Sequence, residues 1–408
     1  MKIWLINHYA VPPQYYPLAR PSLFAQNLQA MGHQVTIIAA GTVHNTDCVN
    51  LIENKERVLK MTDNGLDYVL INCTPYRGNG IDRVRNIAEF ANRLPKVLDR
   101  LEKPDAIVAT SFDPLSCYAG IRYAKKHGIK AVAEIADLWP ETLVAYNGVS
   151  PKNPLVRYLR GIEKKIYTRA DRIVFTMEGA YDYIAEQGWE REIPREKVAY
   201  INNGVDLEQF DFNKETYRVE DAELSDPARF KVVYVGSIRK VNGLDSLLDA
   251  AKKVDDKRIV FLVWGDGDEK ERLMRRVADE KIDNVIFKGK VDKKYVPYIT
   301  SQADLNFAHN HSSELFRFGV SFNKIFDYLA AGKPILCDFD AAHNPVIEQQ
   351  AGIEVKDPTD EAVAQTICQI AENPAAYEPM GRNARAAAED IYNFKILSKK
   401  LAGLIEQI

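Results

Sequence analysis

Short, almost continuous apolar runs alternate with longer segments of helical spacing along the whole chain. The first run, 2–7, is followed by a segment, 21–31, whose apolar residues recur every three or four positions and which Gly32 closes. The next run, 35–40, is again apolar throughout most of its length. Such runs are typical of parallel strands that are buried on both faces. The alternation therefore predicts an α/β protein with a doubly wound parallel sheet.

The alternation occurs twice. Further strands are predicted at 68–73, 105–110, 130–135, 172–176 and 198–201, and then at 230–235, 259–264, 284–287, 304–307 and 334–337. A stretch rich in Asp, Glu and Lys, 207–229, separates the two series, and the last segment, about 377–408, is predicted to be helical. A chain of 408 residues is too long for one ordinary core. We therefore expect an N-terminal Rossmann-like domain at 1–206, a linker at 207–229 and a second Rossmann-like domain at 230–385.

Composition excludes several kinds of protein. The 54 basic and 57 acidic residues give a net charge of -3, which offers no general attraction to nucleic acid. The five cysteines show no CxxC spacing and predict neither a disulfide framework nor a metal site. The N-terminus is predicted to be a strand and not a signal peptide, and no apolar run approaches the length of a membrane span. We expect a cytoplasmic protein whose membrane contact, if it has any, is peripheral.

The segment 318–336 is the most informative about function. A polar loop with Ser321 and Asn323 precedes a short predicted helix, and Asp327 lies one turn inside it. Exposed N–H groups at a helix start can bind an anion such as a diphosphate. Asp327 could accept hydrogen bonds from a ribose. An ordinary capped helix has the same spacing, so this segment does not decide between the two interpretations by itself.

Two glycine-containing loops in the second half follow predicted strands. Gly236 and Ser237 are followed by Arg239 and Lys240, whose charges could neutralise a phosphate. Gly265 marks a turn at the end of the next strand. Neither loop matches a P-loop or a GxGxxG motif, so each is weak evidence alone.

Polar residues in the first half also follow predicted strands, where parallel sheets bind ligands. Tyr9 begins a loop that extends to Arg20, and this loop could hold an acceptor or simply form a rigid turn at Pro12-Pro13. Asp113 and Asp137 are predicted to lie on adjacent loops, where they could bind a sugar hydroxyl or transfer a proton. Asp113 could instead be a helix cap.

The pairing of an aromatic residue, Trp139, with a carboxylate, Glu141, suits a sugar ring. A different pattern, His309 and His311 with Glu314, lacks a third close ligand, so we expect solvated loop histidines and no metal there.

Two predicted helices carry basic residues along one side, opposite an apolar side. These residues are Arg93, Lys96, Arg100 and Lys103 on the first helix, and Arg157, Arg160 and Lys164 on the second. A solvated face is the ordinary explanation, and contact with anionic lipid headgroups is the alternative. Nucleic acid is not expected, because interleaved aromatic residues and a basic balance are absent.

Taken together, the motifs resemble those of retaining glycosyltransferases of family 4, which have the GT-B fold of two facing Rossmann-like domains. The motifs are Lys2-Ile3 with Asn7, Gly32-His33-Gln34-Val35-Thr36, Asp137-Leu138-Trp139-Pro140-Glu141, Asn203-Gly204-Val205-Asp206, Gly265-Asp266-Gly267, Ser321-Phe322-Asn323-Lys324, Asp327-Tyr328 and Gly332-Lys333-Pro334. They are similar to a bacterial subgroup that transfers N-acetylated amino sugars, such as N-acetylfucosamine, in surface polysaccharide synthesis. The family's paired glutamates would fall at Gly319 and Asp327, and its phosphate-binding arginine and lysine at Ser237 and Asn242.

The resemblance implies a hexosyltransferase that moves an N-acetylated hexosamine or deoxyhexosamine from a UDP-sugar to a lipid-linked saccharide. Such a reaction belongs to the synthesis of bacterial polysaccharide, O-antigen or capsule. The implied catalytic residues are Asp137, Arg239 and Lys324; the implied nucleotide-sugar ligands are Gly236, Ser237, Lys240, Gly265, Ser321, Asn323 and Asp327; and the implied acceptor ligands are Tyr9, Arg20, Asp113, Trp139 and Glu141. The resemblance also implies that no cofactor or metal is needed, and that a C-terminal helix, 386–408, returns to the first domain.

Two other functions are compatible with the sequence. A nucleotide-sugar 2-epimerase of the same fold would need acid and base residues around the sugar but no acceptor. A non-enzymatic, two-lobed sugar-binding protein is disfavoured, because such proteins are usually exported and no signal peptide is predicted.

Overall fold

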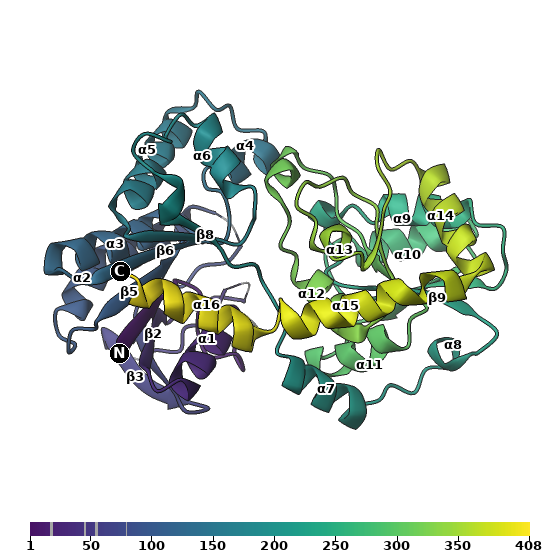
Figure 1. Cartoon of the computed structure of the whole chain (residues 1–408), viewed down its shortest axis with the longest axis horizontal. Coiled ribbons are helices and arrows are strands. Elements are labelled where there is room, and N and C mark those ends of the chain that lie inside the picture. Colours follow the sequence, from purple (N-terminus) through teal and green to yellow (C-terminus); the bar gives the residue numbers. More distant parts are fainter. Residues whose placement is uncertain (17–18, 45, 54–55, 79) are drawn as a thin grey trace. The chain divides into compact units, whose positions relative to one another are not determined.

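The computed structural model describes residues 1–16, 19–44, 46–53, 56–78 and 80–408 (Figure 1). It divides into two compact units, one formed by 1–202 with 397–408 and the other by 203–396. Each unit contains one sheet that is parallel throughout or nearly so, with helices packed against it. The prediction of a doubly wound α/β fold is confirmed.

The first unit contains an eight-stranded sheet in the order β3-β4-β2-β1-β5-β6-β7-β8. The strands are β1 (Lys2–Ile6), β2 (Gln34–Ala40), β3 (Val58–Asp63), β4 (Leu66–Ile71), β5 (Ala106–Thr110), β6 (Lys130–Ile135), β7 (Arg172–Phe175) and β8 (Val198–Tyr200). β1 pairs with β2 on one side and with β5 on the other, so the strand order reverses between β1 and β5. Only the β3–β4 pair is antiparallel among the described strands of this sheet.

Helices pack against the first sheet. They are α1 (Ala19–Ala30), α2 (Ile81–Leu98), α3 (Pro114–His127), α4 (Glu141–Asn147), α5 (Pro154–Arg169), α6 (Ala180–Glu186) and α16 (Phe394–Glu406). α3 approaches the sheet closely at Gly120, where a Cβ would lie 3.0 Å from the Cβ of Ala109 and 3.2 Å from Ile6. Glycine at this position therefore brings the helix against the central strands.

The second unit contains a six-stranded parallel sheet in the order β11-β10-β9-β12-β13-β14. The strands are β9 (Phe230–Val235), β10 (Ile259–Trp264), β11 (Val285–Gly289), β12 (Leu305–Ala308), β13 (Ile335–Cys337) and β14 (Gly352–Glu354). Here the order reverses between β9 and β12. The main helices are α7 (Leu207–Thr216), α8 (Ala222–Ser225), α9 (Asp245–Lys252), α10 (Lys270–Asp279), α11 (Val296–Ser301), α12 (Asn323–Ala331), α13 (Pro345–Glu348), α14 (Asp360–Glu372) and α15 (Glu378–Asp390).

All twelve predicted strands are present with ends within two residues of those expected, and β3 and β14 are additional. The core of the second unit explains why its strands could be recognised. Phe261, Val263 and Phe307 are almost completely buried, as the continuous apolar runs of β10 and β12 require.

The stretch 207–229 differs from the predicted linker, because it contains two helices and belongs to the second unit. Two aspartates begin these helices: Asp206, just before the stretch, accepts a hydrogen bond from the backbone of Gln209 at 3.2 Å, and Asp221, inside it, accepts one from Leu224 at 2.9 Å. These aspartates are helix N-caps, a role that composition alone does not separate from linker polarity. Phe210 and Leu224 are buried.

The chain returns to the first unit later than expected. α15 ends at Asp390, α16 begins at Phe394, and the part grouped with the first unit is 397–408 instead of 386–408. Leu397, Leu401 and Ile405 are buried, and the Lys130 ammonium donates to the Ile405 carbonyl at 3.0 Å. No helix among the described residues has the length and apolar character that crossing a membrane requires.

Candidate functional site

Lys324 occupies the point in the second unit where the strand order reverses. It lies in the first turn of α12, and its ammonium donates to the carbonyl of His309, just after β12, at 2.6 Å. The same nitrogen lies 3.3 Å from the hydroxyl of Tyr234, on β9, and 4.6 Å from the centre of that ring. Lys324 therefore links the carboxyl ends of β9 and β12, which is where doubly wound sheets bind ligands.

The surroundings of Lys324 lower the pKa of its ammonium group. The side chain is partly buried, and loss of contact with water lowers the pKa of its ammonium to about 8. The nearby Asp338 carboxylate acts in the opposite direction, although less strongly. At neutral pH the group is still largely charged, so it can act as a cation towards a bound anion.

His309 and Asp338 form a buried pair beneath Lys324, and sequence reasoning missed it. His309 Nδ1 lies 2.6 Å from Asp338 Oδ2, and both side chains are at most 5% exposed. Within the described part of the chain, His309 Nε2 and Asp338 Oδ1 lack a hydrogen-bond partner. The expectation that His309 is a solvated loop histidine is wrong, because the end of β13 brings an acid against it. The pair fixes the segment whose carbonyl holds Lys324.

The N-terminus of α12 is not capped by the side chain of its N-cap residue. The N-cap of α12 is Phe322, and no side chain accepts a hydrogen bond there. Ser321 instead contacts Asn203, whose backbone N–H lies 3.2 Å from its hydroxyl and whose side chain donates to its carbonyl at 2.9 Å. Asn323 is exposed. The alternative of a helix capped by the side chain of its N-cap residue is therefore wrong, and among the described residues no side chain is seen to accept from the first N–H groups of α12.

Asp327 lies one turn into α12, as expected, with its side chain 14% exposed. Its carboxylate is paired with Lys293, from the segment before α11. The pairing would have to rearrange or be shared if this carboxylate held a ribose.

The loop after β9 places two cations near the same edge of the sheet. Arg239 and Lys240 are exposed, and neither forms an ion pair within the ranges that the structure describes. Ser237 donates from its hydroxyl to the side chain of Asn242 at 2.7 Å, so this hydroxyl stabilises the loop. The free charges of the loop therefore belong to Arg239 and Lys240.

Gly265 is required by the packing of two loops against each other. A Cβ at this position would lie 1.9 Å from the carbonyl oxygen of Gly236, which no side chain can tolerate without movement of the backbone. Gly267 is similar, since its Cβ would lie 2.1 Å from the carbonyl oxygen of Ile238. These glycines allow the loops after β9 and β10 to lie in contact.

Replacing Gly265 with alanine is expected to destabilise the second unit by about 3 kcal/mol, because the loop after β9 must move. Thermal unfolding should then begin about 6–12 °C lower. Gly403→Ala is the matched control, since a Cβ there meets nothing within 4 Å and the residue lies in α16. The control should change stability by about 1 kcal/mol at most, in the stabilising direction. Equal melting temperatures for the two variants would contradict the packing role.

The first unit has a cavity of about 220 Å³ near the point where its own strand order reverses. It is lined by Tyr9, Tyr16, His44, Arg83, Phe112, Asp137 and Trp139. Three of the predicted acceptor-side residues, Tyr9, Asp137 and Trp139, therefore lie together. The rings of Tyr9 and His44 are 4.7 Å apart, and Arg83 donates to the Tyr9 hydroxyl at 3.0 Å. The aromatic walls and the few polar groups are typical of a small-molecule site.

Asp137 is the acidic group of this cavity. Its side chain is exposed, and the protein atoms packed around it partly exclude water and raise the pKa of its carboxyl to about 6. It is therefore an accessible carboxylate that changes charge close to neutral pH.

Asp113 and His8 lie beneath the cavity in a buried polar network. Asp113 caps α3 by accepting a hydrogen bond from the backbone of Ser116 at 2.7 Å. His8 lies 2.6 Å from the side-chain oxygen of Asn86 and 3.7 Å from Asp113, and burial lowers its pKa. Of the two alternatives for Asp113, the structure supports the helix cap.

Arg20 and Glu141, both predicted to bind the acceptor, are used in internal contacts. Arg20 is buried and donates to Glu134 at 3.0 Å and to the carbonyls of Ile201 and Asn202 at 2.8 and 2.7 Å. It thereby connects the segment after β8 to the centre of the sheet. Glu141 forms an ion pair with Arg160. Neither residue is among those that line the cavity.

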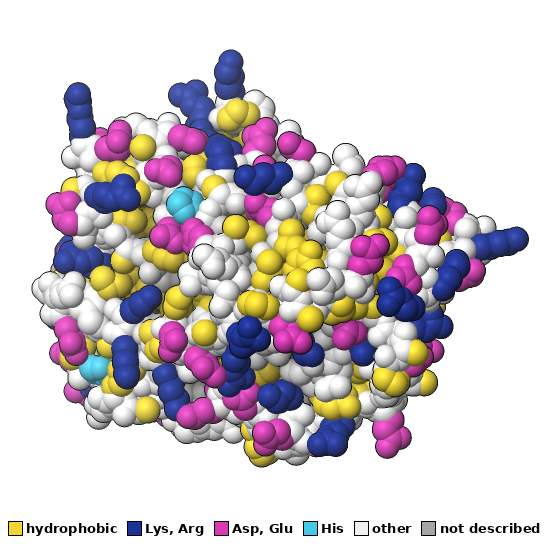
Figure 2. Space-filling view, turned by 45° about the vertical axis from the view of Figure 1, so that its right-hand side comes forward, with side chains coloured by type: hydrophobic (Ala, Val, Ile, Leu, Met, Phe, Trp, Pro, Cys, Tyr) yellow, Lys and Arg dark blue, Asp and Glu magenta, His cyan; other side chains and the backbone are white. Residues whose placement is uncertain are grey.

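Among the described residues, three of the seven cations in the two basic stripes form ion pairs, one in the first stripe and two in the second. Arg93 pairs with Glu89 at 3.3 Å, Lys164 pairs with Glu192 at 2.7 Å, and Arg160 pairs with Glu141. Figure 2 likewise shows basic and acidic side chains interspersed over the face in view. The predicted apolar side of the second stripe is also incomplete, because Leu155 is 57% exposed.

The residues that sequence reasoning missed come from elements far away in the chain. Arg83 and His44 reach the cavity from α2 and from the loop after β2. Neither residue comes directly after a strand, and neither belongs to a recognisable sequence motif. His8 could have been predicted to lie near this cavity, because it directly precedes Tyr9 after the first strand.

Comparisons with known proteins agree with this architecture. Residues 23–209 match the family model "Glycosyltransferase Family 4", and residues 218–387 match "Glycosyl transferases group 1". A sucrose-phosphate synthase from Thermosynechococcus elongatus superimposes with a TM-score of 0.73 at 19% identity, over 100% of this chain and 98% of that one. Anabaena Alr3699/HepE in complex with UDP gives a TM-score of 0.69 at 13% identity, over all of both chains. The fold is that of GT-B glycosyltransferases.

The chain belongs to the family 4 glycosyltransferases, with a group 1 domain as its second unit. Its curated relatives are distant. An uncharacterized glycosyltransferase of Methanocaldococcus jannaschii is 24% identical over 62% of each chain, so the match spans about three fifths of that relative's length. The probable glycosyltransferase WbjE of Pseudomonas aeruginosa is 23% identical over 77% of each chain. A putative colanic acid biosynthesis glycosyl transferase, WcaI of Escherichia coli, is 23% identical over 64% of each.

Proposed function

We propose that this protein transfers a sugar from a UDP-sugar to a lipid-linked saccharide in bacterial polysaccharide synthesis, with retention of the anomeric configuration. The observation that carries the proposal is the position of Lys324, a partly buried ammonium that bridges β9 and β12 where the sheet reverses. A cation in this place suits the diphosphate of a nucleotide sugar.

The donor would bind to the second unit. Lys324, Arg239 and the uncapped N–H groups at the start of α12 would hold the diphosphate, with Lys240 close by. Asp327 would hold the ribose in place of, or together with, its contact to Lys293. Fixed positive groups would stabilise the charge that develops on the departing UDP, which is the main task when no strong nucleophile is present. UDP is proposed as the nucleotide because a structural neighbour, HepE, has been crystallised with UDP and with UDP-glucose.

The acceptor would bind to the cavity of the first unit. Tyr9 and Trp139 offer aromatic faces to a sugar ring, and Asp137 would accept a hydrogen bond from the attacking hydroxyl. The donor sugar is proposed to be an N-acetylated hexosamine or deoxyhexosamine, from the resemblance of the Ser321–Lys324 helix start. No metal is part of the proposal, since the positive charge would come from side chains and backbone.

Exposed apolar side chains on the first unit suit an acceptor that is anchored in a membrane. Ile81 and Val84, at the start of α2, are 86% and 60% exposed. Leu155 and Tyr158, at the start of α5, are 57% and 62% exposed. Both helices begin after the carboxyl ends of strands, on the same edge as the cavity. These side chains could enter the headgroup region of the cytoplasmic membrane face, so the protein is proposed to bind the membrane peripherally.

The test is to incubate the protein with a panel of nucleotide sugars and to measure UDP release with and without a lipid-linked saccharide. Release that requires the acceptor is expected. Conversion of the donor to an isomer without an acceptor would instead indicate the epimerase, and binding without any conversion would indicate a sugar-binding protein.

Asp327→Ala should weaken UDP binding by about tenfold, because one charge-assisted contact to the ribose is lost. Isothermal titration with UDP measures the change, and Asp340→Ala, an exposed aspartate after β13, is the control. Unchanged UDP affinity in Asp327→Ala would exclude the ribose role while leaving the transfer reaction open.

A further inference from the structure

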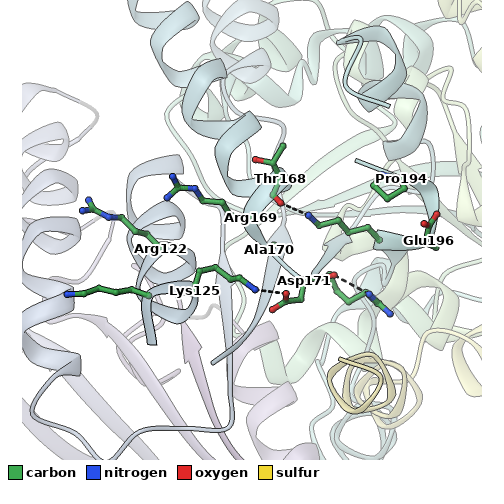
Figure 3. Close-up of a pocket in the computed structure, with 11 residues that line it drawn as sticks. Arg122, Lys125, Thr168, Arg169, Ala170, Asp171, Pro194 and Glu196 are labelled. Atoms are coloured by element: carbon green, nitrogen blue, oxygen red, sulfur yellow. Dashed lines mark hydrogen bonds and ion pairs between the residues drawn. The ribbon is translucent and has the colours of Figure 1, made fainter. Parts of the chain in front are cut away.

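The first unit has a second and larger cavity, of about 860 Å³, with a strongly basic lining (Figure 3). We call it the basic basin. Its cations are Arg122, Lys125, Lys126, Arg169, Arg172 and Lys197. They come from the C-terminal half of α3, from the last turn of α5, from the beginning of β7 and from the short 3-10 helix before β8. Several elements therefore direct positive charge into one concave region.

The basin lies on the edge of the sheet opposite the proposed acceptor cavity. Its residues directly precede β6, β7 and β8, at the amino ends of these strands. Tyr9, Phe112 and Asp137 follow β1, β5 and β6, at the carboxyl ends. A ligand in the basin is therefore separated from the acceptor cavity by the length of the strands, and the basin is not part of that site.

The positive charge of the basin is not balanced by its own acids. Asp171 and Glu196 are the two carboxylates of the lining, against six cations. Asp171 is already used: it pairs with Lys125 at 2.6 Å and accepts a hydrogen bond from the backbone of Ala131 at 2.9 Å. Glu196 is exposed. The lining therefore has a clear excess of positive charge.

The excess positive charge of the basin disfavours the charged form of Lys197. Its side chain is partly buried, and its ammonium donates to the carbonyl of Thr168 at 2.7 Å. Burial lowers its pKa, and the neighbouring charges of Lys125 and Arg172 act in the same direction, while Asp171 opposes them. A bound anion would relieve this repulsion.

The ends of the two helices explain only part of the lining. Lys125, Lys126 and Arg169 lie in last turns, where cations commonly offset the partial negative charge of a helix C-terminus. Arg172 and Lys197 lie outside these helices. Figure 3 shows Arg122 and Arg169 extending to the same side, next to each other in the view. Their planar guanidinium groups are suited to bidentate binding of phosphate oxygens.

We propose that the basic basin binds a phosphate-bearing anion, with Arg122 and Arg169 as its main ligands and Lys197 at its base. None of the described residues that line the basin is aromatic and could stack on a nucleobase, so the phosphate is the recognised group and not a nucleotide. The phosphate can belong to a small soluble compound or to the headgroup of an anionic lipid. The proposal does not depend on the transfer reaction.

The first experiment titrates the full-length protein with inorganic pyrophosphate in the presence of saturating UDP. Arg122→Ala/Arg169→Ala should lose at least about tenfold in pyrophosphate affinity, since two charge-assisted contacts disappear. Both side chains are exposed, so the variant should unfold at the temperature of the unmodified protein. Lys96→Ala/Arg100→Ala, which removes two exposed cations outside the basin, in the last turn of α2 and just after it, is the matched control and should bind pyrophosphate normally.

The second experiment distinguishes the two sources of phosphate. Flotation with vesicles of phosphatidylglycerol and phosphatidylcholine is compared with flotation on phosphatidylcholine alone, for the same three proteins. Binding to phosphatidylglycerol vesicles that is lost in the basin variant alone identifies a lipid headgroup. Loss of pyrophosphate binding without any change in flotation identifies a soluble phosphate compound. If the basin variant matches the control in both experiments, the proposal is overturned, whether or not the protein releases UDP from a sugar donor.

Discussion

Replacing Lys324 with alanine is expected to lower kcat for sugar transfer by about 10²–10³-fold, while the protein stays folded. The ammonium bridges β9 and β12 at the proposed diphosphate site, and its removal takes away a fixed positive charge where UDP would depart. The rate is measured as UDP release with saturating donor and acceptor. Lys333→Ala, in the turn after α12, is the control, because this lysine lies outside the strand junction. Full activity of Lys324→Ala would refute the catalytic role.

The pH dependence gives an independent check of the same residue. Because the pKa of Lys324 is about 8, the ammonium loses its charge as the pH rises through 8, and activity should fall there. Lys324→Arg keeps its charge in this range and should lose this alkaline decline. A decline that persists unchanged in Lys324→Arg would assign it to another group. A bound diphosphate should raise the pKa of Lys324, so the decline in kcat should lie above that in kcat/KM.

Lys324 also links function to stability. The pKa of its ammonium is about 8 in the folded protein and 10.5 for a lysine in water, so between these values the unfolded chain binds more protons than the folded chain. Stability should therefore rise as the pH increases from 8 to 10.5. The burial of this charge costs on the order of 1–3 kcal/mol at neutral pH. Lys324→Met should accordingly unfold at a higher temperature than the unmodified protein, with kcat lowered as in Lys324→Ala.

Replacing Asp137 with asparagine is expected to lower kcat about 10²-fold, because the carboxylate would no longer accept the proton of the attacking hydroxyl. The pKa of this group is about 6, so activity of the unmodified protein should rise as the pH increases through 6. The variant should lose this acidic rise. Asp182→Asn, an exposed position on α6, is the control and should keep both the rate and the pH profile. An acidic rise that survives in Asp137→Asn would place the titrating group elsewhere.

The strands and the helix at 323–331 could be predicted because their signals are local. A buried parallel strand such as β10 is a continuous apolar run, and α12 ends at Gly332. β3 was missed because it is an edge strand whose residues are only half-buried or exposed, so its sequence Val58–Asp63 lacks such a run. β14 (Gly352–Glu354), at an edge of the second sheet, was missed for the same reason, because its three residues are only half-buried. The local pattern therefore predicted the central strands of both sheets and missed one edge strand of each.

The site was predicted less completely, because the residue that pairs with a charged side chain depends on which distant segments the fold brings together. Arg20 is paired with Glu134, 114 residues later, and nothing near Arg20 in the sequence indicates this. Glu141 is likewise neutralised by Arg160 on the following helix. His309 and Asp338 are 29 residues apart and meet only because β12 and β13 are neighbours. Lys324 could be predicted because its helix start is a recognisable local motif.

The return of the last residues to the first unit determines how the protein can be divided. A fragment that stops at residue 202 would lack residues 397–408, which belong to the first unit. It would therefore expose the apolar surface that Leu397, Leu401 and Ile405 cover. Residues 203–396, by contrast, contain every described strand of their own sheet. Exchange of the second unit between relatives therefore needs two junctions, one at 202–203 and one at 396–397, so that each hybrid keeps the C-terminal segment matched to its own N-terminal half.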